Sequence, residues 1–468
     1  MTSNSPMIRR VKHGLSPGIV PSLPRKGRIR VVLALLLIVC IVRIGPPLVR
    51  RFELPAPVSA RDTAPESPQP QGGIPPASLD TRKTTDLSRL LVLNPDSYTK
   101  GSSVVFDGND SLTLYTSIDS SLQRSMTRLV SRYHPLYGAL IALHPASGRV
   151  LALVSYTNDS MPELGGNLCF RSIFPAASVY KTITAAAAVE RAGFSAACSV
   201  EHRGRSHTLY HSQIAPTLDW SVELTFAQAY ARSINAVFAR IGIYEIGGGE
   251  LFNISNRFGF NQAIPGELIC DVSRLMIPDS TFGLAELASG FNQETTISPL
   301  HGALIAAAVA EKGLIPVPSL VDSVVRTGEH RPRYEHYAHS WLNPVRASTA
   351  MELQKMMRSV VTVGTAAKQF RTLRKSRWFD EFTYGGKTGS VDKDGIGRVD
   401  WFIGFATHPQ NPDERIAVGA VTAHGTYWTV HSSYLAAEAI RMYLKNLREQ
   451  KRLQESTVDA ASADSSSS

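Results

Sequence analysis

Acidic side chains are absent from the first 52 residues of this 468-residue chain, where ten lysines and arginines lie. The whole chain has 49 basic and 39 acidic residues, so the other 416 positions carry 39 of each. The formal net charge of +10 therefore belongs to the N-terminus, and the main body has no excess of positive charge. This balance excludes the electrostatic footprint that is typical of DNA- and RNA-binding proteins. We expect no nucleic acid partner.

Internal repeats and a complete set of metal ligands are also missing from the sequence. Three histidines, His202, His207 and His211, cluster in EHRGRSHTLYH, but no cysteine or carboxylate completes a tetrahedral set at the usual spacing. The cluster is therefore more typical of a polar loop than of a metal site. We expect neither a metal ion nor a cofactor.

A long apolar run follows the basic N-terminus. Seven of the ten cations precede VVLALLLIVCIV, Val31 to Val42, and beyond Arg43 the segment IGPPLV extends the run to Val49. The unbroken part has the length of a signal-peptide core, whereas the extended run is close to a membrane span. A cleaved signal peptide is the alternative, with Val-Ser-Ala at 58–60 as its cleavage site, but these residues lie far from the apolar run.

We therefore predict an uncleaved signal anchor at 31–50 and a cytoplasmic basic tail at 1–30, because lysines and arginines next to a membrane span usually stay on its cytoplasmic side. The chain would cross the inner membrane once and place its body in the periplasm. Residues 51–111 are predicted to form a Pro-rich linker and a short connecting segment. A folded domain is expected at 112–450, and the composition predicts a disordered tail at 451–468.

Hydrophobic periodicity predicts an α/β fold for the folded domain. GALIALHPASGRVLALVSY, 138–156, is typical of a β-hairpin around a PASG turn, and RIAVGAVTA, 415–423, is typical of a strand. Helical patterns occur at 178–192, 224–242, 298–313, 348–364 and 432–453. Strands at both ends of the body with helices between them predict a sheet that is built from the two chain ends and covered by helices.

The stretch FPAASVYKTITAAAAVE places Ser178 three residues before Lys181, at the start of a helix that is mostly apolar all round. Such a helix is usually buried, and a buried lysine is costly unless it has a partner or a task. Positions three apart share a helix face and desolvation lowers the pKa of a lysine, so the pair suits a nucleophile beside its base. Simple helix capping by the serine is the alternative, because Ser97 and Lys100 have the same spacing in a turn-rich stretch.

Two more short motifs follow along the chain. Ser233 and Asn235 form the only S-x-N, and Lys387 to Gly389 form the only K-T-G. Alone, the first is typical of a polar helix face and the second of a β-turn. With S-x-x-K before them, and with gaps of 55 and 154 residues, they form the three-part signature of penicillin-recognising serine acyltransferases.

On these motifs the chain resembles the transpeptidase domain of penicillin-binding proteins, over roughly residues 112–447. Other segments are similar to that family as well, among them TSIDSSLQ, TTISPL, VTVGTAAK and DWFIGFA. The resemblance implies a β-lactamase/transpeptidase-like fold, with a central antiparallel sheet flanked by helices and an all-helical subdomain that carries S-x-x-K and S-x-N. It also implies that peptidoglycan stem peptides and β-lactam antibiotics are the ligands.

The resemblance further implies roles for the first two motifs. Ser178 would attack the carbonyl between two terminal D-alanines of a stem peptide, and Lys181 would accept its proton. Ser233 would relay a proton to the leaving amine. Asn235 would hold Lys181 and the substrate amide.

The K-T-G strand is expected to bind the substrate. Lys387 would supply positive potential for the terminal carboxylate, and Thr388 would donate a hydrogen bond to it. Gly389 would leave room for the substrate along the strand. The backbone N–H groups of Ser178 and Ser390 would form the oxyanion hole.

A membrane-anchored D,D-transpeptidase that passes the acyl-enzyme to an amine, and so cross-links the cell wall, is the leading hypothesis. A D,D-carboxypeptidase would use water as the acceptor, and a serine β-lactamase would need a deacylating base, for which Glu267 in PGELICDV is a weak candidate. A penicillin sensor or scaffold is the non-enzymatic alternative. Neither a glycosyltransferase nor a large pedestal domain fits between residues 51 and 112, which leaves open a cell-wall synthesis partner.

Cysteine is scarce, with four residues in the chain. Cys40 lies in the apolar run, and the other three would face an oxidising compartment, where disulfides persist. A helix from Ser178 would be roughly 20 Å long, a distance that the eight residues after Cys169 span when extended. We therefore predict a Cys169–Cys198 disulfide and no partner for Cys270. Three buried free thiols are the alternative.

Overall fold

The computed structural model describes residues 81–466 apart from Asn109. These residues belong to one compact unit. The predicted basic tail, signal anchor and Pro-rich linker lie outside the described residues. Among the helices that are described, none combines the length and the apolar character needed to cross a membrane.

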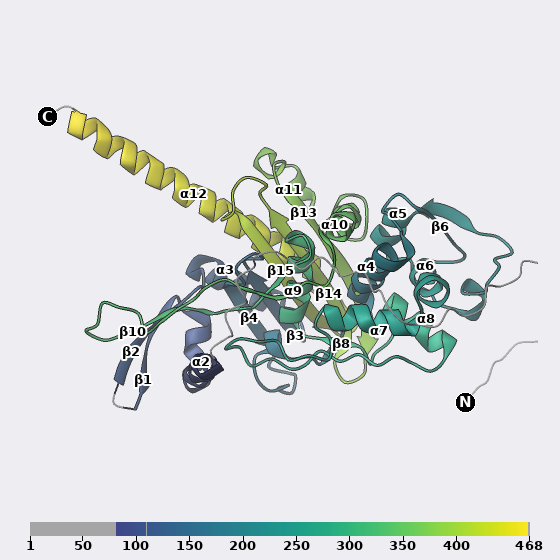
Figure 1. Ribbon diagram of the computed structural model, residues 1–468, viewed down its shortest axis with the longest axis horizontal. Helices are drawn as coiled ribbons and strands as arrows, with labels where there is room; N and C mark the ends of the chain where they lie inside the picture. Colours follow the sequence, from purple (N-terminus) through teal and green to yellow (C-terminus); the bar gives the residue numbers. More distant parts are fainter. Residues whose placement is uncertain (1–80, 109, 467–468) are drawn as a thin grey trace, which may run out of the picture. The chain divides into compact units, whose positions relative to one another are not determined.

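A five-stranded antiparallel sheet forms the centre of this unit, with the strand order β13-β14-β15-β3-β4 (Figure 1). β3 (Tyr137–Leu143) and β4 (Val150–Thr157) form the hairpin that the sequence predicts. The other strands come from far along the chain: β13 (Thr383–Lys393), β14 (Gly397–Thr407) and β15 (Arg415–His424). Because β15 pairs with β3, the sheet joins the two ends of the body, as predicted.

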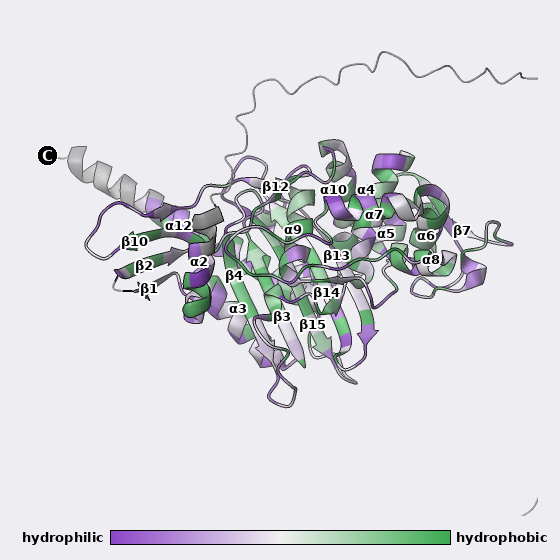
Figure 2. Ribbon diagram, turned by 60° about the horizontal axis from the view of Figure 1, so that its bottom comes forward, coloured by the Kyte–Doolittle hydropathy of each residue, from purple (hydrophilic) through white to green (hydrophobic). Residues whose placement is uncertain are grey.

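Helices cover both faces of this sheet. α9 (Pro299–Ala310) is buried along its whole length because its side chains are mostly small or aliphatic, and it packs against β14 and β15 (Figure 2). α12 (Ser432–Ser466) packs on the opposite face with α3 (Ser120–Tyr133). The helix predicted at 348–364 is α10 (Ala347–Thr362), which packs against β13.

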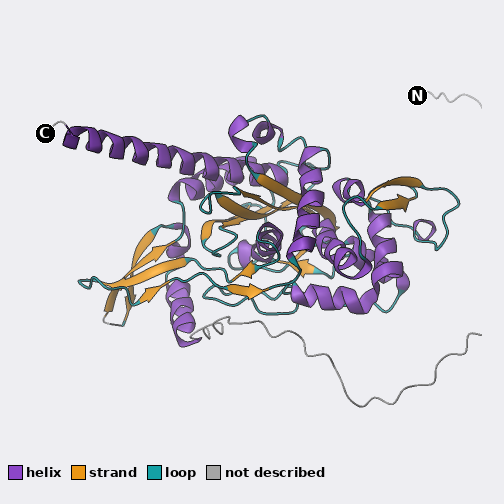
Figure 3. Ribbon diagram, turned by 45° about the horizontal axis from the view of Figure 1, so that its top comes forward, coloured by secondary structure: helices purple, strands orange, loops and turns teal. Residues whose placement is uncertain are grey.

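A helical lobe adjoins the β13 side of the sheet, and its helices are purple in Figure 3. Its main helices are α4 (Lys181–Ala192), α5 (Phe226–Ala231), α6 (Asn235–Arg240), α7 (Gly247–Arg257) and α8 (Thr281–Ser289). The lobe also contains an antiparallel pair, β6 (Ser199–His202) and β7 (Val222–Thr225), so the prediction of an all-helical subdomain is wrong in this detail. Each of these strands has only four residues, which is too short for a clear alternating pattern.

The single helix predicted at 224–242 is also wrong. The segment is divided into α5, α6 and a π-helical stretch, η5 (Ile241–Ile246). Ser233 lies between α5 and α6 with a φ of 55°, in the left-handed region. A right-handed helix cannot continue through such a residue, so the chain must turn there.

The folded unit begins before the predicted boundary at 112. α2 (Thr81–Leu93) leads to β1 (Ser102–Asp107) and β2 (Asp110–Thr116), and β2 pairs with β10 (Val321–Arg326). The boundary therefore cuts through β2, and the segment from 81 to 111 is not a mere connection. Local patterns did not reveal this because the partner strand lies in a distant part of the sequence.

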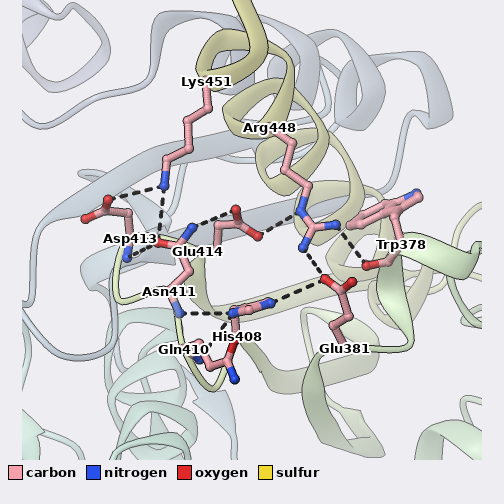
Figure 4. A network of polar contacts seen from close by, with 9 residues as sticks. All are labelled: Trp378, Glu381, His408, Gln410, Asn411, Asp413, Glu414, Arg448 and Lys451. Carbon is pink, nitrogen blue, oxygen red and sulfur yellow. Dashed lines mark hydrogen bonds and ion pairs between the residues drawn. The ribbon is translucent and has the colours of Figure 1, made fainter. Parts of the chain in front are cut away.

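The final helix continues past the predicted tail boundary at 451. Arg448 of α12 donates to Glu414 and Glu381 at 2.8 Å each, and Lys451 pairs with Asp413 at 3.3 Å (Figure 4). These contacts tie the helix to the turn between β14 and β15. The helix runs on to Ser466 through a sequence with several alanines, which favour helix, instead of the disordered tail that the composition predicted.

The predicted disulfide is wrong, because Cys169, Cys198 and Cys270 are all free. Cys169 is buried beneath the β3–β4 hairpin, where its thiol donates to the Val154 carbonyl at 3.2 Å. Burial raises the pKa of Cys169 to about 12. The residues after Cys169 form β5 (Phe174–Pro175), which pairs with Thr296 and Ile297, instead of running back along α4 toward Cys198.

Candidate active site

Ser178 lies in a tight turn that leads from β5 into α4. The turn is a short 3₁₀ helix, η3 (Ala177–Tyr180), and Ala177 has a φ of 49°. The surrounding backbone is so close that a Cβ at Gly290 would lie 2.0 Å from the Ala177 carbonyl oxygen. A Cβ at Gly389 would lie 3.2 Å from the Ser178 nitrogen. Glycines on two neighbouring segments thus allow the chain to hold the serine in this strained turn.

Lys181 is fully buried one turn after the serine, as the S-x-x-K spacing predicts. Its Nζ lies 2.8 Å from Ser178 Oγ and 2.7 Å from Asn235 Oδ1, and it also donates to the Ser289 carbonyl. Burial lowers the pKa of Lys181 well below its ordinary value, and the charge of Lys387 lowers it further. The site therefore favours a neutral amine beside the serine hydroxyl.

Ser97 and Lys100, the other S-x-x-K pair, form no such arrangement. Ser97 is buried in the 3₁₀ helix η1 (Pro95–Thr99), and its Oγ has no hydrogen-bond partner. Lys100 is solvent-exposed and pairs with Asp96 at 3.1 Å. The sequence spacing is the same, but within the described residues Ser97 Oγ makes no hydrogen bond to Lys100 or to any other group.

The S-x-N motif meets the K-T-G motif across the site. The break between α5 and α6 points Ser233 toward β13, where Lys387 Nζ lies 3.0 Å from Ser233 Oγ. Lys387 is fully buried, and burial lowers its pKa to about 7. The Asn235 N–H donates to the Ser206 carbonyl at 2.7 Å, which anchors a loop of the helical lobe to this motif.

A cavity of about 620 Å³ opens above these groups. It is lined by six of the eight residues that the sequence singled out: Ser178, Ser233, Asn235, Thr388, Gly389 and Ser390. The two buried lysines lie behind this lining and reach the cavity through the serines. The structure thus brings together all eight predicted site residues.

Gly389 was predicted to leave room for the substrate along the strand, and it lines the cavity. The space that a Cβ would take also borders the turn at Ala177 to Val179, where three atoms would lie 3.2 Å away. The strand must approach the nucleophile closely, and the missing side chain permits this.

Several lining residues were missed in the sequence. Thr365 donates to or accepts from Thr388 at 2.6 Å between their hydroxyls. Asp400 and His431 also line the cavity, and so does His207, which lies in the segment where the histidine cluster predicted a polar loop. Thr365 lies in VTVGTAAK and Asp400 in DWFIGFA, two segments already noted for their resemblance, whereas nothing in the local sequence marks His431.

The weaker candidates lie apart from the nucleophile. Glu267 does not line the cavity, and its Oε1 accepts hydrogen bonds from Ser319 Oγ and from the Leu320 and Val321 N–H groups. It therefore supports a buried bend of the backbone. Within the described residues no three histidine, cysteine or acidic side chains are grouped to hold a metal ion.

A comparison with known protein families accounts for this geometry. The family model for the penicillin binding protein transpeptidase domain matches residues 138–441. The chain belongs to this family. The match includes all three motifs of the penicillin-binding protein signature and all of the central sheet except Tyr137, the first residue of β3.

Curated proteins also match parts of the chain. Stage V sporulation protein D of Bacillus subtilis is 23% identical over 331 residues, which are 64% of this chain and 48% of that protein. The peptidoglycan D,D-transpeptidase PbpA of Mycobacterium tuberculosis is 29% identical over 222 residues, 41% of this chain and 44% of the relative. The aligned part of the chain thus spans about half the length of the curated relatives it matches.

Solved structures show the same fold. The D,D-transpeptidase domain of a peptidoglycan glycosyltransferase from Eggerthella lenta matches with a TM-score of 0.60 and 22% identity, covering 75% of this chain and 86% of that one. Penicillin-binding protein A of M. tuberculosis, as its imipenem acyl-enzyme complex, matches with a TM-score of 0.56 and 21% identity over 71% and 79% of the two chains. The predicted α/β fold with a central antiparallel sheet is therefore confirmed.

Proposed function

We propose that this protein is a membrane-anchored peptidoglycan D,D-transpeptidase. Ser178 attacks the carbonyl between the two terminal D-alanines of a stem peptide, and the resulting acyl-enzyme passes to an amine acceptor. The observation that carries this proposal is the 2.8 Å contact between the buried Lys181 Nζ and Ser178 Oγ. The names of the relatives, which include peptidoglycan D,D-transpeptidases, support the choice of substrate.

Lys181 accepts the serine proton in the first step. Because burial lowers the pKa of Lys181, its amine is more readily available as a base than that of an exposed lysine. Asn235 Oδ1 accepts one N–H of Lys181 and so fixes the direction of the amine relative to the serine. The new Ser178 Oγ–carbon bond forms as the proton moves to nitrogen.

Ser233 returns the proton to the leaving group. The C–N bond of the D-Ala-D-Ala amide breaks, and the leaving nitrogen takes the proton from Ser233 Oγ, which Lys181 then restores. Lys387 lies 3.0 Å from that hydroxyl and polarises it. The terminal D-alanine therefore departs as a free amine.

The K-T-G strand holds the substrate along the cavity. The Thr388 hydroxyl, which is hydrogen-bonded to Thr365, donates to the terminal carboxylate of the substrate. The protonated form of Lys387 attracts the same carboxylate. The N–H groups of Ser178 and Ser390 stabilise the oxyanion of the tetrahedral intermediate. The close approach of Gly389 to the Ser178 turn supports this arrangement, because it brings the two segments together.

The competing functions have weaker support. Hydrolysis by a β-lactamase needs a base at the acyl-enzyme, but Glu267 is held by three hydrogen bonds outside the cavity. A D,D-carboxypeptidase would use the same residues with water. A sensor or scaffold would not need a lysine with a lowered pKa against the serine.

We place the catalytic domain in the periplasm, anchored to the inner membrane. The basic segment and the apolar run before residue 51 support this location. The sequence between that run and the folded domain is too short for a glycosyltransferase or a large pedestal domain, so we include a separate cell-wall synthesis partner in the proposal.

Labelling of the full-length chain with a fluorescent penicillin tests the assignment. The unsubstituted protein and Ser97→Ala should take up the label, and Ser178→Ala should not. Retention of the label by Ser178→Ala would refute the choice of nucleophile.

A further inference from the structure

The cavity above Ser178 extends along β13 and β14 beyond the K-T-G motif. Its far end is formed by Asp400, Trp428 and His431, together with the ion pair of Asp392 and Arg398. A second cavity of about 450 Å³ at the β13–β14 hairpin shares Asp392, Arg398 and Trp428 with the first. None of these residues belongs to the three motifs, so the groove is longer than the known chemistry requires.

Asp400 is a buried carboxylate that lacks a strong positive partner. The residue is 5% exposed, its Oδ2 accepts the Ser432 N–H at 2.7 Å, and the same oxygen lies 3.7 Å from His431 Nδ1. Within the described part of the chain, Oδ1 receives no hydrogen bond and no lysine or arginine pairs with Asp400. This oxygen is not fully buried, so it can accept a hydrogen bond from a charged group in the cavity that Asp400 lines.

The neighbouring charges do not supply that partner. Arg398 lies two residues before Asp400 on the same face of β14, but its guanidinium is held by both carboxylate oxygens of Asp392, at 2.8 and 2.7 Å. The His431 side chain is 48% exposed and carries charge only when protonated. The far end of the groove is thus negative, whereas its other end lies against Lys387.

We propose that Asp400 and His431 bind the protonated amine of the acceptor, the second substrate of the transfer, which releases its extra proton to solvent before the neutral nitrogen attacks the acyl-enzyme. The inference rests on the proposed function. The donor peptide brings a carboxylate, for which the K-T-G strand provides, whereas a free amine is mostly a cation near neutral pH. Asp400 lies directly opposite Ser390 in the register of β13 and β14, so an amine bound there waits beside the strand that holds the donor.

Trp428 completes this site. Its ring lies 4.7 Å from the His431 ring, and both line the cavity. An aromatic face beside a carboxylate is a favourable surface for an ammonium group. The acceptor site thus combines a buried anion, a histidine and an aromatic wall.

Asp400 also stabilises the start of α12 through Ser432, and this structural role must be separated from binding. Asp400→Asn keeps an oxygen for the Ser432 N–H while it removes the charge. His431→Gln alters the second partner and leaves the contact with Ser432 intact. Asp159→Asn, in an exposed loop, is the matched control for loss of a carboxylate.

The experiment measures how an acyl-enzyme partitions between water and added nucleophiles. The full-length chain is acylated with a soluble thioester analogue of the donor, and D-alanine or hydroxylamine is then added. D-alanine carries an ammonium group, whereas hydroxylamine is mostly uncharged near neutral pH. Asp400→Asn should raise the half-saturating D-alanine concentration about tenfold and His431→Gln about threefold, with hydroxylamine transfer, donor acylation and Asp159→Asn unchanged.

Three results would overturn the inference. One is an unchanged D-alanine dependence in both variants, and another is an equal change for D-alanine and hydroxylamine. The third is slower acylation by the donor with no change in acceptor use, which would assign the pair to the donor. Failure of the unsubstituted chain to form any acyl-enzyme would refute the proposed function and this inference with it, whereas normal acylation with any of the three results refutes this inference alone.

Discussion

The chain contains two serine-lysine pairs with the same spacing, and the structure gives them opposite surroundings. Lys181 is buried and bonds both Ser178 and Asn235, whereas Lys100 is exposed to solvent and pairs with Asp96. The second lysine thus contacts a carboxylate instead of its serine. An S-x-x-K pair can therefore act as nucleophile and base only when burial lowers the pKa of the lysine and a third residue directs its amine.

Substitution of the two lysines should give the largest difference in acylation rate between the two pairs. Lys181→Met should slow acylation by penicillin about a thousandfold, because the serine loses its proton acceptor. Lys100→Met should leave the rate unchanged. Stopped-flow or gel-based labelling kinetics would measure both rates. Comparable losses in the two variants would contradict the claim that only the buried lysine assists acylation.

Asn235 is the third residue that the Ser97 pair lacks. Asn235→Ala should slow acylation about a hundredfold, because Lys181 loses the acceptor that orients it. Asn446→Ala, a surface change on α12, serves as the control for loss of an amide. An acylation rate within twofold of the unsubstituted protein would show that burial alone directs the lysine.

Gly389 tests how closely the strand must approach the nucleophile. Gly389→Ala places a methyl group 3.2 Å from the Ser178 nitrogen and should slow acylation about tenfold. Gly249→Ala in α7, where an added Cβ meets nothing, should acylate normally. Equal rates for both variants would indicate that the turn adjusts freely.

The pH profile of acylation should report Lys387. Burial lowers the pKa of Lys387 to about 7, so its positive charge is present below that pH and is lost as the pH rises through it. The second-order rate constant with penicillin should therefore fall roughly fivefold between pH 7 and pH 8. A profile that stays flat from pH 7 to pH 9 would contradict a role for the charged lysine in binding the carboxylate.

Ser97 should give the smallest effect. Its buried Oγ has no hydrogen-bond partner, so Ser97→Ala removes a polar group without breaking a bond. The free energy of unfolding should stay the same or rise by up to about 1 kcal/mol, as measured by urea denaturation. A loss of more than about 1.5 kcal/mol would reveal a partner for this hydroxyl.

Much of the site could be predicted because its residues lie in short motifs with fixed order. The seven motif residues and Ser390 line one cavity or lie directly behind its lining, and the sheet of the two chain ends follows from the positions of the hairpin and the last strand. The break at Ser233 was missed because the residues around it keep helical periodicity, while the turn depends on contacts with β13.

Other features depend on partners that local sequence does not show. β2 pairs with β10, and Asp400 meets His431 from the loop before α12. The Cys169–Cys198 prediction failed because it assumed a path along α4, whereas the chain after Cys169 enters β5. In each case a tertiary contact, which no spacing rule encodes, decides the outcome.

The pairing of β3 with β15 has a consequence for synthesis of the chain. The ribosome makes the turn with Ser178 and Lys181 long before it makes the K-T-G strand and β15, so the nascent nucleophile has neither Lys387 nor a completed sheet beside it. Pairing between such distant segments is slow, because the chain must close a long loop before the contacts form. The protein therefore gains reactivity only in its last stage of folding, and an incomplete chain that ends before β13 is expected to stay inert toward penicillin.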